Sequence, residues 1–128
     1  MAEGFAKDML KFEKHLINSA GVSPEGLNNF AVQVMGEVGV DISTQYSKNL
    51  NTLNLNVFDM VVTVCDNAKK KCPIVRHKKL IHYNFYDPAS SKGTISDQLT
   101  TYRKVRDEIK HMIKNILTNY DELCQELN

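Results

Sequence analysis

One stretch of the sequence, residues 60–73 (MVVTVCDNAKKKCP), limits the possible folds more than any other. It opens with an uninterrupted run of apolar and β-branched residues, which favours a strand buried on both faces of a parallel sheet. The strand ends at Cys65, and a charged loop separates it from Cys72. In open α/β sheets, ligands bind beyond the carboxyl ends of the strands. The stretch therefore predicts chemistry based on its two thiols.

The composition indicates a small protein without a membrane anchor. The chain has 128 residues, 42% of them hydrophobic, and no apolar run is long enough to cross a bilayer. We expect one domain over residues 1–128. The formal net charge of +1 gives no global attraction to nucleic acid. The start, MAEGFAKDML, lacks the basic end and apolar centre of a signal peptide, which predicts a cytoplasmic protein. Three cysteines in that reducing compartment favour catalysis or metal binding over structural disulfides.

In the first third of the chain, apolar spacing and turn residues predict two helices around a short strand. Residues 1–14 have one apolar face and predict a helix without a capping side chain. Residues 16–22 run into a glycine turn and predict the strand. Asn28 or Asn29 is expected to cap the second helix, and Gly39 to close it in a left-handed conformation.

The sequence after residue 46 predicts that strands and helices continue to alternate. Ser47 is expected to cap a short helix that reaches Leu53, and residues 80–85 predict a strand after the central one. A long helix with one apolar stripe is expected from Ser96 to Leu127. Strands that alternate with helices predict an α/β sandwich with a parallel sheet.

The spacing of the cysteines alone leaves three interpretations open. Cys65 and Cys72 can be a redox pair, two inert thiols, or half of a zinc site completed by His77 and His82. Six intervening residues are not a usual zinc-finger spacing. Cys124 falls on the apolar stripe of the last helix, where packing is its expected role.

Two basic runs flank the second cysteine, at residues 69–71 and 76–79. Such runs are most often solvated loops, although they can attract an oxyanion or an acidic partner. No aromatic platform accompanies them, so they do not predict a nucleic-acid site.

Six segments, in this order and spacing, carry a resemblance to a known family: MAEGFAK, NSAGV, AVQVMGEVGVDIS, DMVVTVCDNAKKKCP, FYDPA and YRKVRDEI. Together they resemble the thioredoxin-coupled arsenate reductases, which are built on the low-molecular-weight tyrosine phosphatase fold. The resemblance runs from Met1 to about Lys114, and the Cys65/Cys72 spacing is its most specific part. It implies a three-layer sandwich around a central parallel sheet.

The resemblance also implies a mechanism. In the family, a cysteine in a Cys-x5-Arg oxyanion loop attacks arsenic, a second cysteine attacks the first and releases arsenite, and a third closes a disulfide that thioredoxin reduces. Cys65 matches the second cysteine and Cys72 the third, while Asp87 matches the general acid. Arsenate is the implied substrate and thioredoxin the electron donor, with no bound cofactor or metal in the relay. Without the resemblance, Asp87-Pro88 is ordinary turn sequence.

The sequence departs from the family at its start. The family places a strand and the Cys-x5-Arg loop directly before the segment that here begins at Met1, and Cys124 cannot replace that nucleophile. We therefore expect an N-terminally incomplete domain that is inactive by itself, with its natural start upstream. The alternatives are a non-catalytic remnant or binding module of the same fold, and, less favoured, a phosphatase relative, in which Cys65 and Cys72 would have no role.

Some members of the family also bind potassium. Glu3 and Ser19 match liganding positions, but Lys48 stands where those members carry a carboxylate. The resemblance thus leaves it open whether this chain holds the ion.

Overall fold

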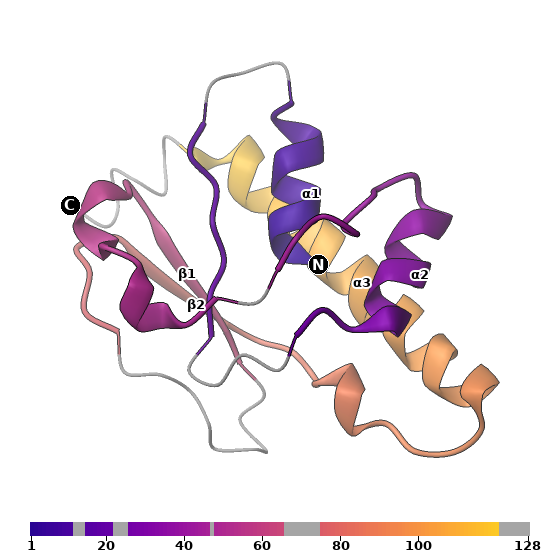
Figure 1. The fold of residues 1–128 in the computed structure, drawn as a ribbon. Coiled ribbons are helices and arrows are strands. Elements are labelled where there is room, and N and C mark those ends of the chain that lie inside the picture. Colours follow the sequence, from indigo (N-terminus) through magenta and orange to yellow (C-terminus); the bar gives the residue numbers. More distant parts are fainter. Residues whose placement is uncertain (12–14, 22–25, 47, 66–74, 121–128) are drawn as a thin grey trace.

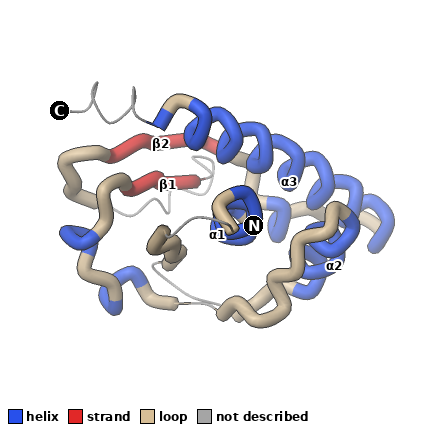
Figure 2. The backbone as a smooth tube through the Cα atoms, turned by 90° about the horizontal axis from the view of Figure 1, so that it is seen from above, coloured by secondary structure: helices blue, strands red, loops and turns tan. Residues whose placement is uncertain are grey.

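The computed structural model describes residues 1–11, 15–21, 26–46, 48–65 and 75–120. Its helices and strands follow one another as α1, α2, β1, β2 and α3, with short 3-10 turns between them. Helix α3 runs along one side of the molecule, beside the two strands at one end and beside α2 at the other (Figure 1, Figure 2). The expected α/β class is confirmed.

Helix α1 spans Ala2–Met9 and is therefore shorter than the helix expected over residues 1–14. It begins at Met1 without a side-chain cap, as its sequence indicated, and it buries Glu3 and Phe5. It ends at Leu10, whose ψ of 17° leaves the helical region. The following Lys11 is exposed, so a further turn would gain little from packing.

Helix α2 spans Asn29–Glu37 and confirms its predicted caps. The Oδ1 atom of Asn28 accepts hydrogen bonds from the N–H groups of Phe30 and Ala31, at 2.8 and 3.1 Å. Gly39 has a φ of +80°, the left-handed conformation that ends many helices and that glycine adopts without strain.

Strands β1 (Val61–Cys65) and β2 (Leu80–Asn84) form a parallel pair in which Val61 is in register with Leu80 and Cys65 with Asn84. Both predicted strands and their parallel direction are confirmed. The expectation that β1 is buried on both faces is wrong, since Val64 is 46% exposed. Among the described residues, β1 pairs with β2 as its only neighbouring strand.

Residues 15–21 do not form the strand that their sequence predicted. Within the described part of the chain they make a single isolated bridge, between Gly21 and Asn49. It consists of Gly21 N–H to Lys48 O at 3.0 Å and Leu50 N–H to Gly21 O at 2.8 Å. Leu16 is 65% exposed, so the apolar side chain that suggested a strand has no surface to pack against. A strand needs neighbours as well as propensity.

The short helix expected before β1 is a pair of 3-10 turns, Leu50–Thr52 and Leu55–Val57. Asn49 caps the first turn and Asn54 the second, each through its side-chain oxygen. The expected cap, Ser47, lies outside the described residues.

Helix α3 spans Ile95–Thr118 and begins with a capping box, in which Thr94 Oγ1 accepts from Asp97 N–H and Asp97 Oδ2 accepts from Thr94 N–H. The predicted apolar stripe is confirmed up to Ile116, and the expected continuation over residues 121–128, including Cys124, lies outside the described residues. The buried residues of α3 are Leu99, Tyr102, Val105, Arg106, Ile109, Met112, Ile113 and Ile116.

One hydrophobic core joins the helices and the sheet. Phe5 of α1, Met35 of α2 and the following Ile42 pack against the stripe of α3, while Val62 and Tyr83 add the strands to the same cluster. A smaller cluster of Val34, Leu99 and Tyr102 extends it towards the start of α3. The sheet is thus held in place by α3.

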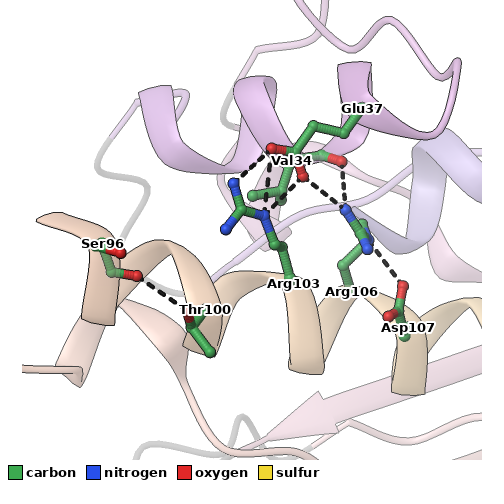
Figure 3. Close-up of polar contacts among 7 residues, drawn as sticks. All are labelled: Val34, Glu37, Ser96, Thr100, Arg103, Arg106 and Asp107. Atoms are coloured by element: carbon green, nitrogen blue, oxygen red, sulfur yellow. Dashed lines mark hydrogen bonds and ion pairs between the residues drawn. The ribbon is translucent and has the colours of Figure 1, made fainter.

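A polar contact fixes α2 on α3 (Figure 3). Arg106 is 9% exposed, and its Nη1 donates to the carbonyl of Val34 and to Glu37 Oε1, both at 3.0 Å. Arg103 binds Glu37 with two nitrogens, at 2.8 to 3.2 Å. The N–H of Val38 bonds to Gly36 and Met35, so Arg106 supplies a donor that the end of α2 would otherwise lack.

Candidate active site

The carboxyl ends of β1 and β2 bring two of the three predicted site residues to one edge of the sheet. Cys65 is the last residue of β1 and is in register with Asn84, the last residue of β2. Asp87 follows Asn84 by three residues. Because parallel strands end at the same edge, the backbone of Cys65 and the turn at Asp87 lie on the same side of the molecule.

Asp87 is held by a compact turn. It precedes the 3-10 turn Pro88–Ser90, and its Oδ1 accepts a hydrogen bond from Ala89 N–H at 2.9 Å. The hydroxyl of Ser91 donates to Pro88 O at 2.6 Å and closes the turn. A cavity of about 400 Å³ lies between Tyr86 and Ser91 on one side and helix α3 on the other, and Asp87 does not line it. Asp87 is partly exposed, and the hydrogen bond from Ala89 N–H restrains its carboxyl within the turn.

A chain of hydrogen bonds runs along the exposed face of the two strands towards the same edge. The hydroxyl of Thr63 donates to His82 Nδ1 at 2.7 Å, and His82 Nε2 donates to Asn84 Oδ1 at 3.1 Å. The parallel register places Thr63 opposite His82. The sequence did not predict these hydrogen bonds, although the alternation of residues 80–84 places His82 and Asn84 on one face.

His77 and His82, which could complete a zinc site with the two cysteines, make other contacts in the structure. His77 Nε2 donates to Phe58 O at 2.9 Å, and its Nδ1 accepts from Lys79 N–H at 3.0 Å. Both nitrogens of His82 are bonded as well. A metal would have to break one of these contacts on each ring. In the part of the chain that the structure describes, no three His, Cys, Asp or Glu side chains group around a common point.

The remaining predicted residue, Cys72, lies outside the described residues, as do the lysines at residues 69–71 and Cys124. The roles of Cys65, Cys72 and Asp87 therefore stay predictions. None of the helices in the described ranges is long and apolar enough to cross a membrane.

A parallel strand pair packed on a long helix, with a cysteine and an aspartate at its carboxyl edge, is typical of an open-sheet α/β protein, whose ligands bind at the strand ends. The sequence model for low molecular weight phosphotyrosine protein phosphatases matches residues 1–128, and the chain belongs to this family.

Several relatives of the chain are arsenate reductases. The chain is similar to an arsenate reductase of Bacillus subtilis (strain 168), with 44% identity over 115 residues that cover 89% of this chain and 82% of the relative. It is also similar to an arsenate reductase of Shouchella clausii (strain KSM-K16), with 45% identity and the same coverage.

Solved structures agree with this similarity. A structure described as an arsenate reductase in the phosphate binding state superposes with a TM-score of 0.75 at 26% identity, over 92% of this chain and 86% of that one. A structure described as an arsenate reductase in the oxidized state superposes over 99% of this chain and 87% of that one, with a TM-score of 0.69 and 26% identity. The expected low-molecular-weight phosphatase-like fold is confirmed.

Proposed function

We propose that this chain is the relay part of an arsenate reductase: it supplies Cys65 and Cys72 to a cysteine relay that reduces arsenate to arsenite and that thioredoxin regenerates, and it needs a Cys-x5-Arg loop for turnover. The observation that carries the proposal is that Cys65 ends β1 in register with Asn84, three residues before Asp87. The arsenate reductases of two bacteria, at 44 and 45% identity, support the same activity.

The relay transfers two electrons in balanced steps. A nucleophilic cysteine in a Cys-x5-Arg loop, a segment that residues 1–128 do not contain, displaces water from arsenate and forms a sulfur–arsenic bond. The thiolate of Cys65 then attacks that cysteine's sulfur, so that a disulfide forms and the bonding pair leaves with arsenic as arsenite. Cys72 attacks Cys65, frees the nucleophile and leaves a Cys65–Cys72 disulfide. The dithiol of thioredoxin reduces this disulfide and is itself oxidised.

Asp87 is the proposed general acid. Arsenate loses an oxygen when the sulfur–arsenic bond forms, and that oxygen leaves more readily once it is protonated. The turn around Asp87 holds the carboxyl at the sheet edge, where an oxyanion would approach. We expect Asp87→Asn to lower kcat by roughly 10²- to 10⁴-fold, the range typical of a lost acid catalyst.

Arsenate turnover tests the proposal. We compare residues 1–128 with the same sequence carrying the family's strand and Cys-x5-Arg loop ahead of Met1, and follow NADPH oxidation by thioredoxin and thioredoxin reductase. Residues 1–128 contain no Cys-x5-Arg segment, so we expect turnover only from the longer protein. In that protein Cys65→Ser and Cys72→Ser should abolish multiple turnovers, while Cys124→Ser should not.

Full activity of Cys65→Ser or Cys72→Ser would refute the relay. Hydrolysis of p-nitrophenyl phosphate separates the proposal from the phosphatase alternative, because phosphoryl transfer needs the loop cysteine but neither Cys65 nor Cys72. A longer protein that hydrolyses this ester and leaves arsenate unreduced would favour a phosphatase.

A further inference from the structure

A buried carboxylate lies in the first turn of α1, outside the candidate active site. The side chain of Glu3 is only 4% exposed, although a carboxylate is rarely buried without partners. Its Oε1 accepts from Ser19 Oγ at 2.9 Å and from Lys48 Nζ at 3.4 Å, while Lys7 Nζ lies 3.2 Å from Oε2. Burial opposes ionisation, but the Ser19 hydrogen bond and the two ammonium groups outweigh it and hold the pKa of Glu3 below its usual value.

The two lysines on Glu3 have different environments. Lys7 lies one turn further along α1 and is 51% exposed, so it is a surface partner that water can replace. Lys48 comes from a segment 45 residues away and is 13% exposed. Its Nζ also lies 4.9 Å from the ring centre of Tyr46, within the range of a cation–π contact. Lys48 is thus the buried counter-charge of Glu3.

Lys48 also belongs to the contact that fixes the segment carrying Ser19. Its carbonyl accepts from Gly21 N–H at 3.0 Å, and Leu50 N–H returns a hydrogen bond to Gly21 O at 2.8 Å. The Lys48 side chain therefore closes a small ring in which α1, residues 19–21 and residues 48–50 are tied together. The ammonium group of Lys48 contacts α1 through Glu3, and the backbone of Lys48 contacts Gly21, so one residue links three segments that are far apart in the sequence.

The same residues fail a test for the potassium ion that some members of the family bind. A hard cation is held by oxygen ligands, and Glu3 and Ser19 offer two. The third liganding position is occupied by Lys48, whose ammonium nitrogen contacts Glu3 Oε1. The same oxygen accepts the hydrogen bond from Ser19. A potassium ion on that oxygen would lie against the ammonium group, and two like charges at contact distance repel strongly when they are shielded from water. The site as built does not fit potassium.

We propose that the Lys48 ammonium group replaces a monovalent cation, so that this chain holds its α1 junction together without potassium. The lysine brings the charge covalently, whereas a bound ion has to be captured from solution. Removal of the Lys48 ammonium group leaves the side-chain oxygens of Glu3 and Ser19 as a site for a cation. Replacement of Lys48 by aspartate adds the oxygen ligand and places two carboxylates together, an arrangement that a cation stabilises.

Thermal unfolding in two salts tests the proposal independently of arsenate reduction. Tm is measured in 200 mM potassium chloride and in 200 mM choline chloride, since choline is too large for the site. We expect equal Tm values for the wild-type chain and for Lys7→Ala, the matched control that removes the exposed ammonium. Lys48→Asp and Lys48→Ala should be less stable in choline and gain about 3 °C or more in potassium, as expected when an ion binds only the folded state.

Two outcomes would overturn the proposal. One is a potassium-specific rise in Tm of the wild-type chain, which would mean that the ion binds despite Lys48. The other is a folded Lys48→Asp variant with the same Tm in both salts. If neither substitution folds in choline, recovery of the folded circular dichroism spectrum on addition of potassium supports the proposal, and failure to recover in potassium contradicts it.

Discussion

Gly4 allows α1 to approach the core, and we expect Gly4→Ala to destabilise the fold although alanine favours helices. An added Cβ at Gly4 would lie 2.6 Å from Ile42 Cγ2 and 3.2 Å from Met35 Cε. Ile42 is 1% exposed and Met35 is fully buried, so neither has room to move aside. The glycine is needed for packing and not for its backbone conformation.

The size of the effect follows from two opposing contributions. Alanine in place of glycine inside a helix stabilises by about 0.8–1 kcal/mol. Overpacking of a closed core costs about 1–3 kcal/mol. The net destabilisation by Gly4→Ala is therefore about 0–2 kcal/mol. Gly36 in α2 provides the matched control, because an added Cβ there meets no atom within 4 Å. Gly36→Ala should stabilise by up to about 1 kcal/mol, which places the two variants about 1–3 kcal/mol apart.

Urea denaturation followed by circular dichroism measures both changes. In an Ile42→Ala background the clashing methyl group is gone, so Gly4→Ala should become neutral or stabilising there, and a double-mutant cycle isolates that coupling. If Gly4→Ala raises the midpoint as much as Gly36→Ala does in the wild-type background, the packing of α1 described above is wrong.

Three further predictions concern the attachment and start of α3. Arg106→Met leaves the Val34 carbonyl without its donor and should lower the free energy of unfolding in urea by about 1–3 kcal/mol. Arg106→Lys should not restore it, because lysine has a single nitrogen, whereas arginine contacts Val34 and Glu37 through Nη1 and Asp107 through Nε. Thr94→Ala removes half of the capping box and should lower the free energy of unfolding by about 1 kcal/mol, while Thr100→Ala on the exposed face should change it far less. The Thr94 backbone N–H and hydroxyl hold the pKa of Asp97 below its usual value, so its contribution is present above the unfolded-state pKa and lost as the pH falls through the folded-state pKa. In urea denaturation measured at a series of pH values, Asp97→Asn should therefore lose less of its free energy of unfolding at acid pH than the wild-type chain does. The same dependence on pH in both proteins would contradict this role of Asp97.

The elements that local sequence determines were predicted well. Asn28 caps the start of α2 and Gly39 ends it in a left-handed conformation, both as predicted. The apolar spacing of α3 correctly predicted its buried stripe. The position of Asp87 directly beyond β2 also follows from sequence, because the end of an apolar run marks the end of a strand.

What sequence could not predict depends on neighbours from distant parts of the chain. Arg106 looks like an exposed helical arginine, and only the position of α2 turns it into a buried donor. Lys48 lies in a segment without periodicity, so only the family resemblance grouped it with Glu3, 45 residues earlier, and its ion pair with Glu3 came from the structure. Leu16 shows the opposite error, since strand propensity without a described partner strand leaves it 65% exposed.

We propose above that Cys65 and Cys72 form a disulfide that thioredoxin reduces. The direct measurement is the NADPH consumed when the oxidised 128-residue chain is mixed with thioredoxin and thioredoxin reductase. We expect about one NADPH per chain, none for Cys65→Ser or Cys72→Ser, and an unchanged value for Cys124→Ser, because one disulfide takes up two electrons. Consumption that persists in Cys65→Ser, or none in the wild-type chain, would contradict it.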